Sequence, residues 1–485
     1  MPYSDLRDFL KFLEQKGQLL RIKSEIDPRL EITEVLNRLL AKGGPAVLFE
    51  KVKGHSIPVV ANLFGTLERI AWGLDTTVEG LKEIGEFLAF LQHPEPPKSL
   101  VDAVKKLPLY GQVFTLAPKK VKKAPCQEVI LEGKDIDLSK FPILTCWPDD
   151  AAPQITWSLV ITKPPDDGPY NIGIYRMQVE GPDRTLMRWL KHHGGAKHYR
   201  AWKKAGKAMP VAVAIGTDPG MMVAAVTPVP ERMSEFHFAG LLRKKAVELV
   251  SCRTIPLEVP ATSEMILEGE IHPDEEAPEG PHGDHTGYYN SVEPFPVFRL
   301  KCITHRRNPY YLTTTTGRPP REDAMTGLAL NIIFLPLLRQ HFPEVVDFHL
   351  PMEGVSYRFA IISIKKEYPG HAKRMMMGLW GFLKQFLYVK FIIIVDDDID
   401  VRKWEDIIWA IATRVDPVRD VTMIDHSPID YLDFASPLPE LGSKMGIDAT
   451  TKIPPETIRE WGKKITMDPE VVKRVDQLWK ELGLN

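Results

Sequence analysis

Residues 276–290, with the sequence EAPEGPHGDHTGYYN, bring carboxyl and imidazole groups close together along the chain. The groups belong to Glu279, His282, Asp284 and His285. Interspersed glycines and prolines predict a loop rather than a helix or strand, with a backbone that can approach a ligand closely. Glu279 and Asp284 can divide an acid role from a base role if their surroundings separate their pKa values. The simpler interpretation is a turn that acids and histidines only cap.

A second group of polar residues lies on or just after two predicted strands, in the segments NIGIYR and LMRWLKHHGG. Guanidinium groups and backbone N–H groups next to glycines both suit anions, so this group predicts a phosphate or carboxylate cradle. Exposed strand arginines and a solvated histidine turn remain the alternative. The residues concerned are Asn171, Arg176, Arg188, His192, His193, Gly194 and Gly195.

Two further segments carry metal-ligand residue types. SEFHFAGLLRKKAVELV offers Glu235 and His237, but without the HExxH spacing that would enforce a zinc site. The acidic run at residues 396–398 suggests magnesium, yet it follows a predicted buried strand, where acids commonly cap the next turn. Neither segment establishes a metal site by itself.

Composition excludes several classes of protein. The chain has 485 residues, 44% hydrophobic, and a net charge of -2, which predicts two or three globular domains and no basic surface for nucleic acid. Four scattered cysteines favour a reducing, cytoplasmic location, and the longest apolar stretch, LALNIIFLPLL, is too short for a transmembrane segment. The chain lacks GxGxxG, GxxxxGK[ST] and GxSxG motifs, which disfavours Rossmann, P-loop and α/β-hydrolase chemistry.

Hydrophobic periodicity divides the chain into three regions. Residues 1–120 form a predicted α/β region, with a helix in LEITEVLNRLLAKGG and strands in PAVLFEKV and IPVVANLF. Residues 121–320 are rich in strands, which predicts a barrel or sandwich. Residues 321–485 form a predicted α/β domain, in which the apolar run 391–395 is a strand buried on both faces of a parallel sheet. The predicted central strands are ITWSLVITK, YNIGIYRMQVEG, RTLMRWLK, PVAVAIG, MMVAAVTPV, VELVSCRT, SEMILEGEI, VFRLKCITH and YYLTTTTG.

Two segments stand apart from these regions. HPEPPKSLVDAVKKLPLYG, residues 93–111, is rich in proline and lysine and predicts a linker. PEVVKRVDQLWKELGL near the end of the chain predicts an amphipathic helix that can dock on another subunit.

The ordered blocks of the whole chain resemble the UbiD family of prenylated-flavin-dependent decarboxylases. The resemblance implies an α+β and α/β multidomain protein, in which a central split β-barrel binds flavin between an N-terminal α/β region and a C-terminal α/β domain. The matching blocks are YSDLRDFL, LEITE, GGPAVLFE, NLFGT, CWPDDAAP, NIGIYR, MRWL, VTPVPERMSE, APEGPHGDHTGYYN, TGRPP, HAKRMMMG, DPVRD, IDYLDFASP and GSKMGIDAT.

The same resemblance implies a cofactor site. Prenylated FMN is held through a divalent metal, usually Mn²⁺, with a monovalent cation such as K⁺ nearby. The chain departs from the family at His193, where relatives carry arginine, and Lys444 is a further candidate phosphate contact. The metal ligands by resemblance are Asn171, His192 and Glu235, and the flavin contacts are Ile174, Tyr175, Arg176, Arg188, Trp189, Leu190, His193 and Gly194.

For the reaction, the resemblance implies that Arg176, Glu279 and Asp284 form a network in which Asp284 donates the proton. The implied reaction is decarboxylation of a 4-hydroxy-3-polyprenylbenzoate in ubiquinone biosynthesis, since the flavin takes up the electrons that departing carbon dioxide leaves behind. The implied partners are a flavin prenyltransferase that supplies the cofactor and further copies of the chain, as in a hexamer. Peripheral contact with the inner face of the cell membrane is compatible with such a substrate.

Other functions remain open at this point. The same chemistry can act on another aromatic or acrylic acid, or run in the carboxylating direction. A metal-dependent hydrolase using His192, Glu235 and Asp284 belongs to a different class, as does a flavin-binding protein without activity.

Overall fold

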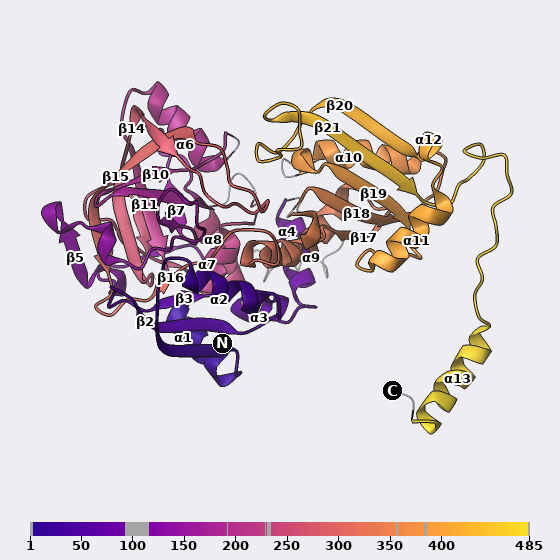
Figure 1. Ribbon diagram of the computed structural model, residues 1–485, viewed down its shortest axis with the longest axis horizontal. Coiled ribbons are helices and arrows are strands. Elements are labelled where there is room, and N and C mark those ends of the chain that lie inside the picture. The colour runs from indigo at the N-terminus through magenta and orange to yellow at the C-terminus, as the bar shows by residue number, and fades with distance from the viewer. Residues whose placement is uncertain are drawn as a thin grey trace, which may run out of the picture.

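The computed structural model describes residues 3–92, 116–191, 193–227, 229, 234–355, 357–382 and 386–483 (Figure 1). Two bodies lie side by side in Figure 1, and helix α9 (Glu322–His341) runs between them. The predicted linker at residues 93–111 lies wholly outside the described residues.

The N-terminal residues form a four-stranded sheet in the order β1-β2-β3-β16, in which β16 (Tyr311–Leu312) returns from much later in the chain. Helix α1 begins after Asp5, whose side chain accepts a hydrogen bond from Asp8 N–H, and it buries an apolar face on this sheet. The predicted helix at LEITEVLNRLLAKGG is observed as α2. The elements are α1 (Leu6–Gln15), β1 (Leu19–Ile26), α2 (Glu31–Leu40), β2 (Ala46–Val52), β3 (Val59–Ala61), α3 (Leu67–Gly73) and α4 (Leu81–Gln92).

The central region is built on a nine-stranded sheet in the order β6-β9-β10-β15-β14-β11-β7-β8, with β5 paired to β15. Its long hairpin, β14 (Met265–Glu279) and β15 (Glu293–His305), carries the loop singled out in the sequence. A smaller sheet runs β13-β12-β4. The other strands are β4 (Lys119–Lys120), β5 (Val129–Glu132), β6 (Gln154–Ile155), β7 (Leu159–Thr162), β8 (Asn171–Ile174), β9 (Met177–Gly181), β10 (Arg184–Met187), β11 (Met209–Ile215), β12 (Glu248–Ser251) and β13 (Glu258–Pro260).

Helices of this region are α6 (Gly194–Lys204), α7 (Pro219–Ala224) and α8 (Glu235–Arg243), with short 3₁₀ turns at Pro125–Gln127, Gly133–Asp135 and Leu138–Lys140. The strand predicted at MMVAAVTPV is wrong, because its first four residues belong to α7 and the next three form a turn. Asp218 accepts a hydrogen bond from Met221 N–H and Pro219 occupies the first turn, which together start a helix. All six residues of α7 are buried, so its sequence shows no helical periodicity.

The C-terminal body has a five-stranded sheet in the order β17-β18-β19-β21-β20. Strand β19 (Phe391–Asp396) pairs in parallel with both β18 and β21, and residues 392–395 are buried, which confirms the prediction for this apolar run. The remaining elements are β17 (Val345–His349), a 3₁₀ turn (Met352–Gly354), β18 (Phe359–Ile364), α10 (His371–Phe382), a 3₁₀ turn (Phe386–Tyr388), α11 (Trp404–Arg414), α12 (Pro417–Asp420), β20 (Val421–Pro428) and β21 (Leu441–Ala449).

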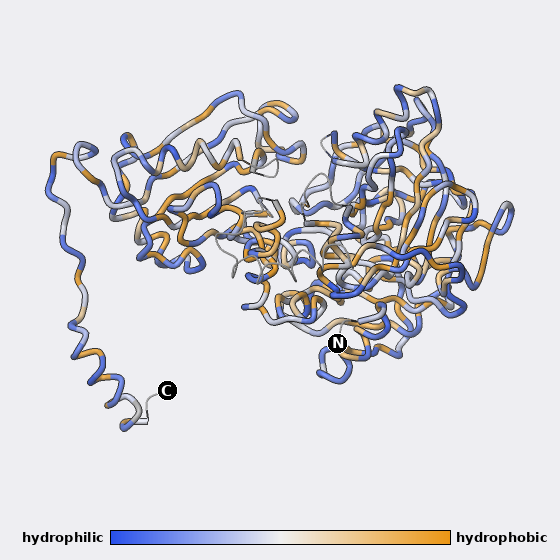
Figure 2. The backbone as a smooth tube through the Cα atoms, turned by 180° about the vertical axis from the view of Figure 1, so that it is seen from behind, coloured by the Kyte–Doolittle hydropathy of each residue, from blue (hydrophilic) through white to orange (hydrophobic). Residues whose placement is uncertain are grey.

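Helix α13 (Pro469–Glu481) stands away from both bodies at the end of an extended segment (Figure 1). In Figure 2 its tube alternates between hydrophobic and hydrophilic residues, as predicted for an amphipathic helix. Its apolar side chains are exposed, at 40–68% for Val471, Val472, Val475, Leu478, Trp479 and Leu482.

All four cysteines are unpaired thiols, and all but the half-buried Cys252 are buried. Burial raises the pKa of Cys126, Cys146 and Cys302 to about 12. Across the described ranges, every helix is too short or too polar to cross a membrane.

Candidate functional site

Three side chains from distant segments meet where β8, β14 and the loop after β14 come together. Arg176 follows β8, Glu279 is the last residue of β14, and Asp284 lies in the loop between β14 and β15. Arg176 Nε donates to Glu279 Oε1 at 3.1 Å, while its Nη1 donates to Asp284 Oδ2. All three are largely buried, so one guanidinium stands between two carboxylates with little access to solvent.

Glu279 is the centre of this network. Its Oε2 accepts hydrogen bonds from Arg188 Nη1 at 2.6 Å and from Asn290 Nδ2 at 3.3 Å. Arg176 Nη2 in turn donates to Asn290 Oδ1 at 2.9 Å. Glu279 itself is 0% exposed, so its negative charge depends on these donors rather than on water.

The prediction that all of residues 276–290 form a loop is wrong for the first four residues. Residues 276–279 continue β14 and pair with β15, where Pro278 faces Pro294. Two prolines in one pair remove N–H groups from both strands at the same point, so the ladder tolerates them. The chain then turns at Gly280, whose φ is 98°.

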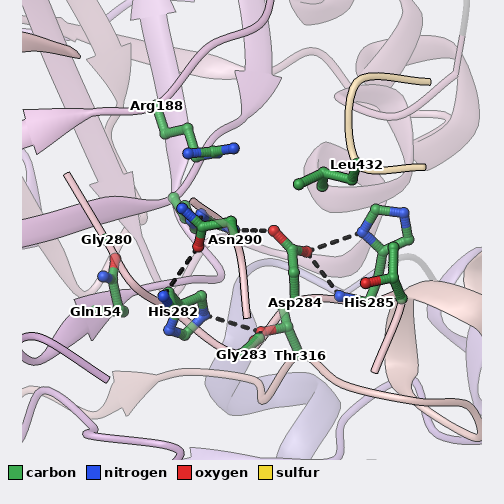
Figure 3. A network of polar contacts seen from close by, with 12 residues as sticks. Gln154, Arg188, Gly280, His282, Gly283, Asp284, His285, Asn290, Thr316 and Leu432 are labelled. Carbon is green, nitrogen blue, oxygen red and sulfur yellow. Dashed lines mark hydrogen bonds and ion pairs between the residues drawn. The ribbon is translucent and has the colours of Figure 1, made fainter. Parts of the chain in front are cut away.

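The loop after Gly280 is held in place by polar contacts between its residues and neighbouring segments (Figure 3). His282 is 0% exposed, with Nδ1 3.0 Å from Asp150 Oδ1 and Nε2 3.0 Å from Thr316 Oγ1. Gly283 N–H donates to the same Asp150 oxygen at 2.9 Å, and a Cβ at Gly283 would lie 2.2 Å from the Trp147 ring. His282 therefore shapes the loop, while the residues that follow it face the network.

Asp284 and His285 carry opposite charges at the end of the network (Figure 3). Burial raises the pKa of Asp284, but the Arg176 guanidinium and the hydrogen bond from His285 outweigh burial and hold this pKa well below its usual range. Burial lowers the pKa of His285, but its interactions with Asp284 and Asp430 outweigh burial and raise it to about 10. Near neutral pH, Asp284 is therefore a carboxylate and His285 an imidazolium.

The predicted metal ligands Asn171 and Glu235 lie close together at the start of β8 and of α8. Glu235 accepts a hydrogen bond from the backbone N–H of Ile172, and burial raises the pKa of its carboxyl to about 7. Glu235 Oε2 and Asn171 Nδ2 are buried with no hydrogen-bond partner among the described residues. A Cβ on Gly194 would lie 1.7 Å from Asn171 Oδ1, so only glycine leaves this oxygen its place. His192, the third predicted ligand, falls outside the described residues.

This pair of oxygen donors fits a hard divalent cation. A buried carboxyl with an unpartnered oxygen and no basic side chain bonded to it among the described residues is costly to ionise, and a cation would remove that cost. Among the described residues, no cluster of three His, Cys, Asp or Glu side chains forms a metal site. The ligand set would therefore consist of the amide of Asn171, the carboxyl of Glu235 and a third residue outside the described ranges, for which His192 is the candidate.

Several of the predicted flavin contacts lie near Asn171 and Glu235. Tyr175 is buried, with its ring centroid 6.1 Å from that of Trp189 and 5.3 Å from that of His193. His193 precedes α6, and Gly194 begins this helix. Ile174 ends β8, and its side chain is half-buried.

Arg188 connects the network to a cavity between the two bodies. Its guanidinium lies 4.8 Å from the centroid of the Phe295 ring and 5.5 Å from that of Tyr431, and its Nη2 is buried without a hydrogen-bond partner among the described residues. Burial and the charge of Arg176 lower the pKa of Arg188. The neighbouring cavity has a volume of about 360 Å³ and is lined by the apolar or aromatic residues Trp189, Leu190, Pro294, Phe295, Tyr431 and Pro439 and by the charged residues Lys191, Glu293 and Glu440.

Two groups considered from the sequence make other contacts in the structure. Lys444 of β21 donates to the backbone carbonyls of Val389, at 2.9 Å, and of Leu387. Asp396 and Asp398 both bind Arg414, with contacts of 2.6 and 2.8 Å, which disfavours a magnesium site there. Asp396 and Asp398 thus neutralise the charge of the buried Arg414 in the C-terminal body.

Sequence reasoning missed the groups that connect the loop to the rest of the molecule. Asp150 and Asp430 lie in the conspicuous segments CWPDDAAP and IDYLDFASP, but nothing in the spacing of either segment indicates a histidine partner. Asn290 belongs to the loop that was singled out, and its amide joins Arg176 to Glu279.

Comparisons with known proteins match nearly the whole chain. Models of the N-terminal, Rift-related and C-terminal domains of 3-octaprenyl-4-hydroxybenzoate carboxy-lyase (UbiD) match residues 10–88, 119–319 and 324–449. The UbiD-class enzyme HmfF from Pelotomaculum thermopropionicum in complex with FMN is 33% identical, with 97% of this chain and 98% of that chain covered and a TM-score of 0.79. An evolved dimeric form of HmfF in complex with prFMN gives the same values. Vanillic acid decarboxylase from Sedimentibacter hydroxybenzoicus, in closed form, is 32% identical over 100% of both chains, with a TM-score of 0.85.

Proposed function

This chain belongs to the UbiD family of carboxy-lyases, and on that premise we propose that it catalyses prenylated-FMN-dependent, non-oxidative decarboxylation of an aromatic acid. The observation that carries the proposal is the buried network of Arg176, Glu279 and Asp284. Prenylated FMN, when bound, supplies the electron sink that amino-acid side chains cannot provide after carbon dioxide leaves. The network supplies the charges that orient the substrate and the acid that returns a proton.

Arg176 and Glu279 hold the geometry of the reaction centre. The Arg176 guanidinium fixes one oxygen of Asp284, while Glu279 fixes Arg176 and Arg188 through its two oxygens. Such a preorganised set of charges needs little rearrangement during reaction. Asp284 lies at the end of the network and delivers the proton to the product carbon.

The low pKa of Asp284 has a consequence for the reaction. A carboxylate flanked by Arg176 and His285 does not carry a proton in the resting protein near neutral pH. A negatively charged substrate close to Asp284 would raise its pKa, because like charges disfavour the ionised form. The proton therefore reaches Asp284 during the catalytic cycle.

Asn171, His192 and Glu235 would hold Mn²⁺, whose positive charge would attract the flavin phosphate, and K⁺ would be the monovalent cation of the site. The unpartnered oxygen of Glu235 supports this assignment. Arg188, Trp189 and Leu190 would contact the flavin together with Ile174, Tyr175, Arg176, His193 and Gly194. His193 has its ring against Tyr175, so we assign it a packing role beside the cofactor.

For the substrate, we favour a 4-hydroxy-3-polyprenylbenzoate that yields a 2-polyprenylphenol for ubiquinone biosynthesis. The cavity of about 360 Å³ beside Arg188 supports this choice, because its Trp189, Phe295 and Tyr431 side chains offer apolar surface that an aromatic acid without a long substituent does not need. Rates measured with benzoates that carry substituents of zero to three prenyl units discriminate this substrate from smaller aromatic acids. A preference for the unsubstituted acid would contradict the assignment.

The remaining partners follow from this assignment. A flavin prenyltransferase supplies the cofactor, and α13 joins copies of the chain in a homo-oligomer such as a hexamer. The protein acts in the cytoplasm, with peripheral contact to the membrane in which its product dissolves. The domain boundaries proposed are residues 1–120, 121–320 and 321–485.

The test of the proton donor is Asp284→Asn in protein produced together with a flavin prenyltransferase. The amide keeps the shape of the carboxyl but carries no acidic proton, so flavin content should persist while kcat falls by roughly 10²- to 10⁴-fold. Asp149→Asn is the matched control, because Asp149 is exposed on the neighbouring loop. A flavin-loaded Asp284→Asn protein that releases carbon dioxide at the wild-type rate would refute the role of Asp284.

A further inference from the structure

His285 links the central loop to the C-terminal body. Its backbone N–H and its Nδ1 both lie within hydrogen-bond distance of Asp284 Oδ1, at 2.7 and 2.8 Å. On its other side, Nε2 lies 3.8 Å from Oδ2 of Asp430, a residue between β20 and β21. The imidazole therefore stands between two carboxylates that belong to different parts of the fold (Figure 3 shows its contact with Asp284).

Asp430 is itself held firmly. Its side chain is 3% exposed, Arg358 Nη2 donates to Oδ2 at 2.8 Å, and the backbone N–H of Leu432 donates to Oδ1 at 3.0 Å. Leu432 also lies beside Asp284 and His285 in Figure 3. Asp430 is thus a fixed anion against which the imidazole can be aligned.

The placement between two carboxylates determines the protonation of His285. A neutral imidazole has one N–H and one lone pair, so it would point a lone pair at one of the two anions. In the imidazolium, Nδ1–H donates to Asp284, while Nε2–H lies 3.8 Å from Asp430 Oδ2, an ion-pair contact rather than a hydrogen bond, so the positive charge suits both neighbours. A proton is thereby stored 2.8 Å from the oxygen of Asp284 that needs one.

We propose that His285 holds the proton that Asp284 delivers to the product, and that Asp430 positions His285 for this transfer. This inference rests on the proposed function, in which Asp284 is the proton donor. Because His285 acts through Asp284, it is a positioning and relay residue rather than a group that touches the substrate.

The proton balance of the relay is closed. The Nδ1–H bond of the imidazolium breaks and an O–H bond forms on Asp284 Oδ1, which leaves a neutral imidazole and a carboxylic acid. The acid then gives this proton to the ring carbon from which carbon dioxide has departed, and Asp284 returns to a carboxylate. The neutral imidazole takes a new proton from water, so one proton is consumed for each carbon dioxide released.

Other charged groups face His285 and must be included in any pH dependence. Asp323 of α9 acts on it electrostatically from the N-terminal end of that helix. Behind Asp430 stand Arg358 and the half-buried Tyr357, whose pKa burial and Asp430 raise. Three carboxylates thus surround the imidazole, and removing Asp430 leaves Asp284 and Asp323.

The experiment compares His285→Asn, Asp430→Asn and the control His272→Asn, in which the exposed His272 of β14 is changed. Each holoenzyme is assayed for flavin content and for kcat and KM across pH 6–10 with a prenylated hydroxybenzoate. His285→Asn keeps an N–H near Asp284 but releases no proton, so we expect normal flavin content, near-normal KM and a kcat lowered by roughly 10²-fold. In Asp430→Asn the loss of activity at high pH should begin at a lower pH than in the wild type, because one stabilising anion is gone.

A second measurement does not depend on turnover. In cofactor-free protein with labelled histidines, NMR difference spectra against His285→Asn identify the His285 ring and report its protonation. We expect an imidazolium at pH 8 in the wild type and titration at lower pH in Asp430→Asn. A neutral His285 ring in wild-type protein at pH 7.5 overturns the proposal even if Asp430→Asn fails to fold.

The experiments distinguish an error in the proton donor from an error in the relay. If Asp284→Asn turns over at the wild-type rate, the donor itself is wrong. If Asp284→Asn is slow but His285→Asn matches the wild type in kcat and in its pH profile, the donor stands and the relay through His285 is overturned.

Discussion

Replacing Glu279 by glutamine tests whether the buried network is held together by its charge. Glu279 is 0% exposed and accepts hydrogen bonds from Arg176, Arg188 and Asn290. A glutamine keeps the size of the side chain, but one of its ends becomes an NH₂ group that must face another donor. The buried guanidinium groups of Arg176 and Arg188 then lose their shared anion, and the carboxylates left near them are Asp284 and Glu293.

The expected magnitude follows from the burial of these groups. Removing one partner of a buried ion pair typically costs about 3–5 kcal/mol, because the remaining charge stays desolvated. A loss of that size lowers the melting temperature of a domain of this size by roughly 6–20 °C. We expect this drop in cofactor-free protein, where flavin binding cannot mask it.

Glu275→Gln is the matched control, since Glu275 lies on the same strand and pairs with Arg299. There the Arg299 side chain is 43% exposed and that of Glu275 is 29% exposed, so the change should cost under about 1 kcal/mol. Differential scanning fluorimetry of the two variants gives the comparison. Equal melting temperatures for Glu279→Gln and Glu275→Gln would refute the reasoning.

Glu279→Gln should also lower kcat, because Arg176 loses the partner that orients it toward Asp284. Combined with Asp284→Asn, the loss should be smaller than the product of the two single losses, since groups that act as a unit are not additive. Multiplicative losses would indicate that the two carboxylates act separately.

Three further predictions concern other parts of the chain. Glu235→Gln should purify with little flavin or metal by absorbance and elemental analysis, and because burial raises the pKa of Glu235 to about 7, wild-type metal occupancy should fall as pH drops through that value. Burial lowers the pKa of Lys444 to about 8, so between pH 8 and about 10.4 the unfolded chain binds more protons than the folded one. The free energy of unfolding measured by urea titration should therefore rise with pH across this range, by at most about 3 kcal/mol. The variant Lys444→Met should lack this rise. Deleting residues 468–485 should lower the mass measured by light scattering from that of an oligomer toward that of a single chain, because the exposed apolar side chains of α13 are then no longer available to bind another copy.

The sequence predicted elements well where one periodicity dominates. Helix α2 has one apolar face and β19 is a short, continuously apolar run, and both patterns have a direct structural meaning. Helix α7 was mistaken for a strand because burial on all sides removes the helical period. Residues 276–279 were assigned to a loop because local proline and glycine content cannot reveal a partner strand that also carries proline.

For the site, the sequence placed Arg176, Glu279 and Asp284 in one network by resemblance, and the structure brings these three side chains into contact. The contact between His285 and Asp430 could not be predicted, because the two residues are far apart in the chain and meet only where the two bodies pack. The pKa of Asp284 is likewise lowered by the charged neighbours Arg176 and His285, whose proximity the sequence spacing alone does not give.

The protected thiols make the protein suitable for site-specific labelling. With pKa values near 12, Cys126, Cys146 and Cys302 are almost wholly uncharged at pH 7.5, and burial raises the pKa of Cys252 still further. Since only thiolates react readily with maleimides, the native cysteines of the wild-type chain should take up little maleimide label. Tyr288 of the central loop and Phe434 of the C-terminal body are both exposed, with ring centroids 6.3 Å apart. Spin labels attached through Tyr288→Cys and Phe434→Cys would therefore report directly, as a distance distribution, how far the two bodies separate in solution.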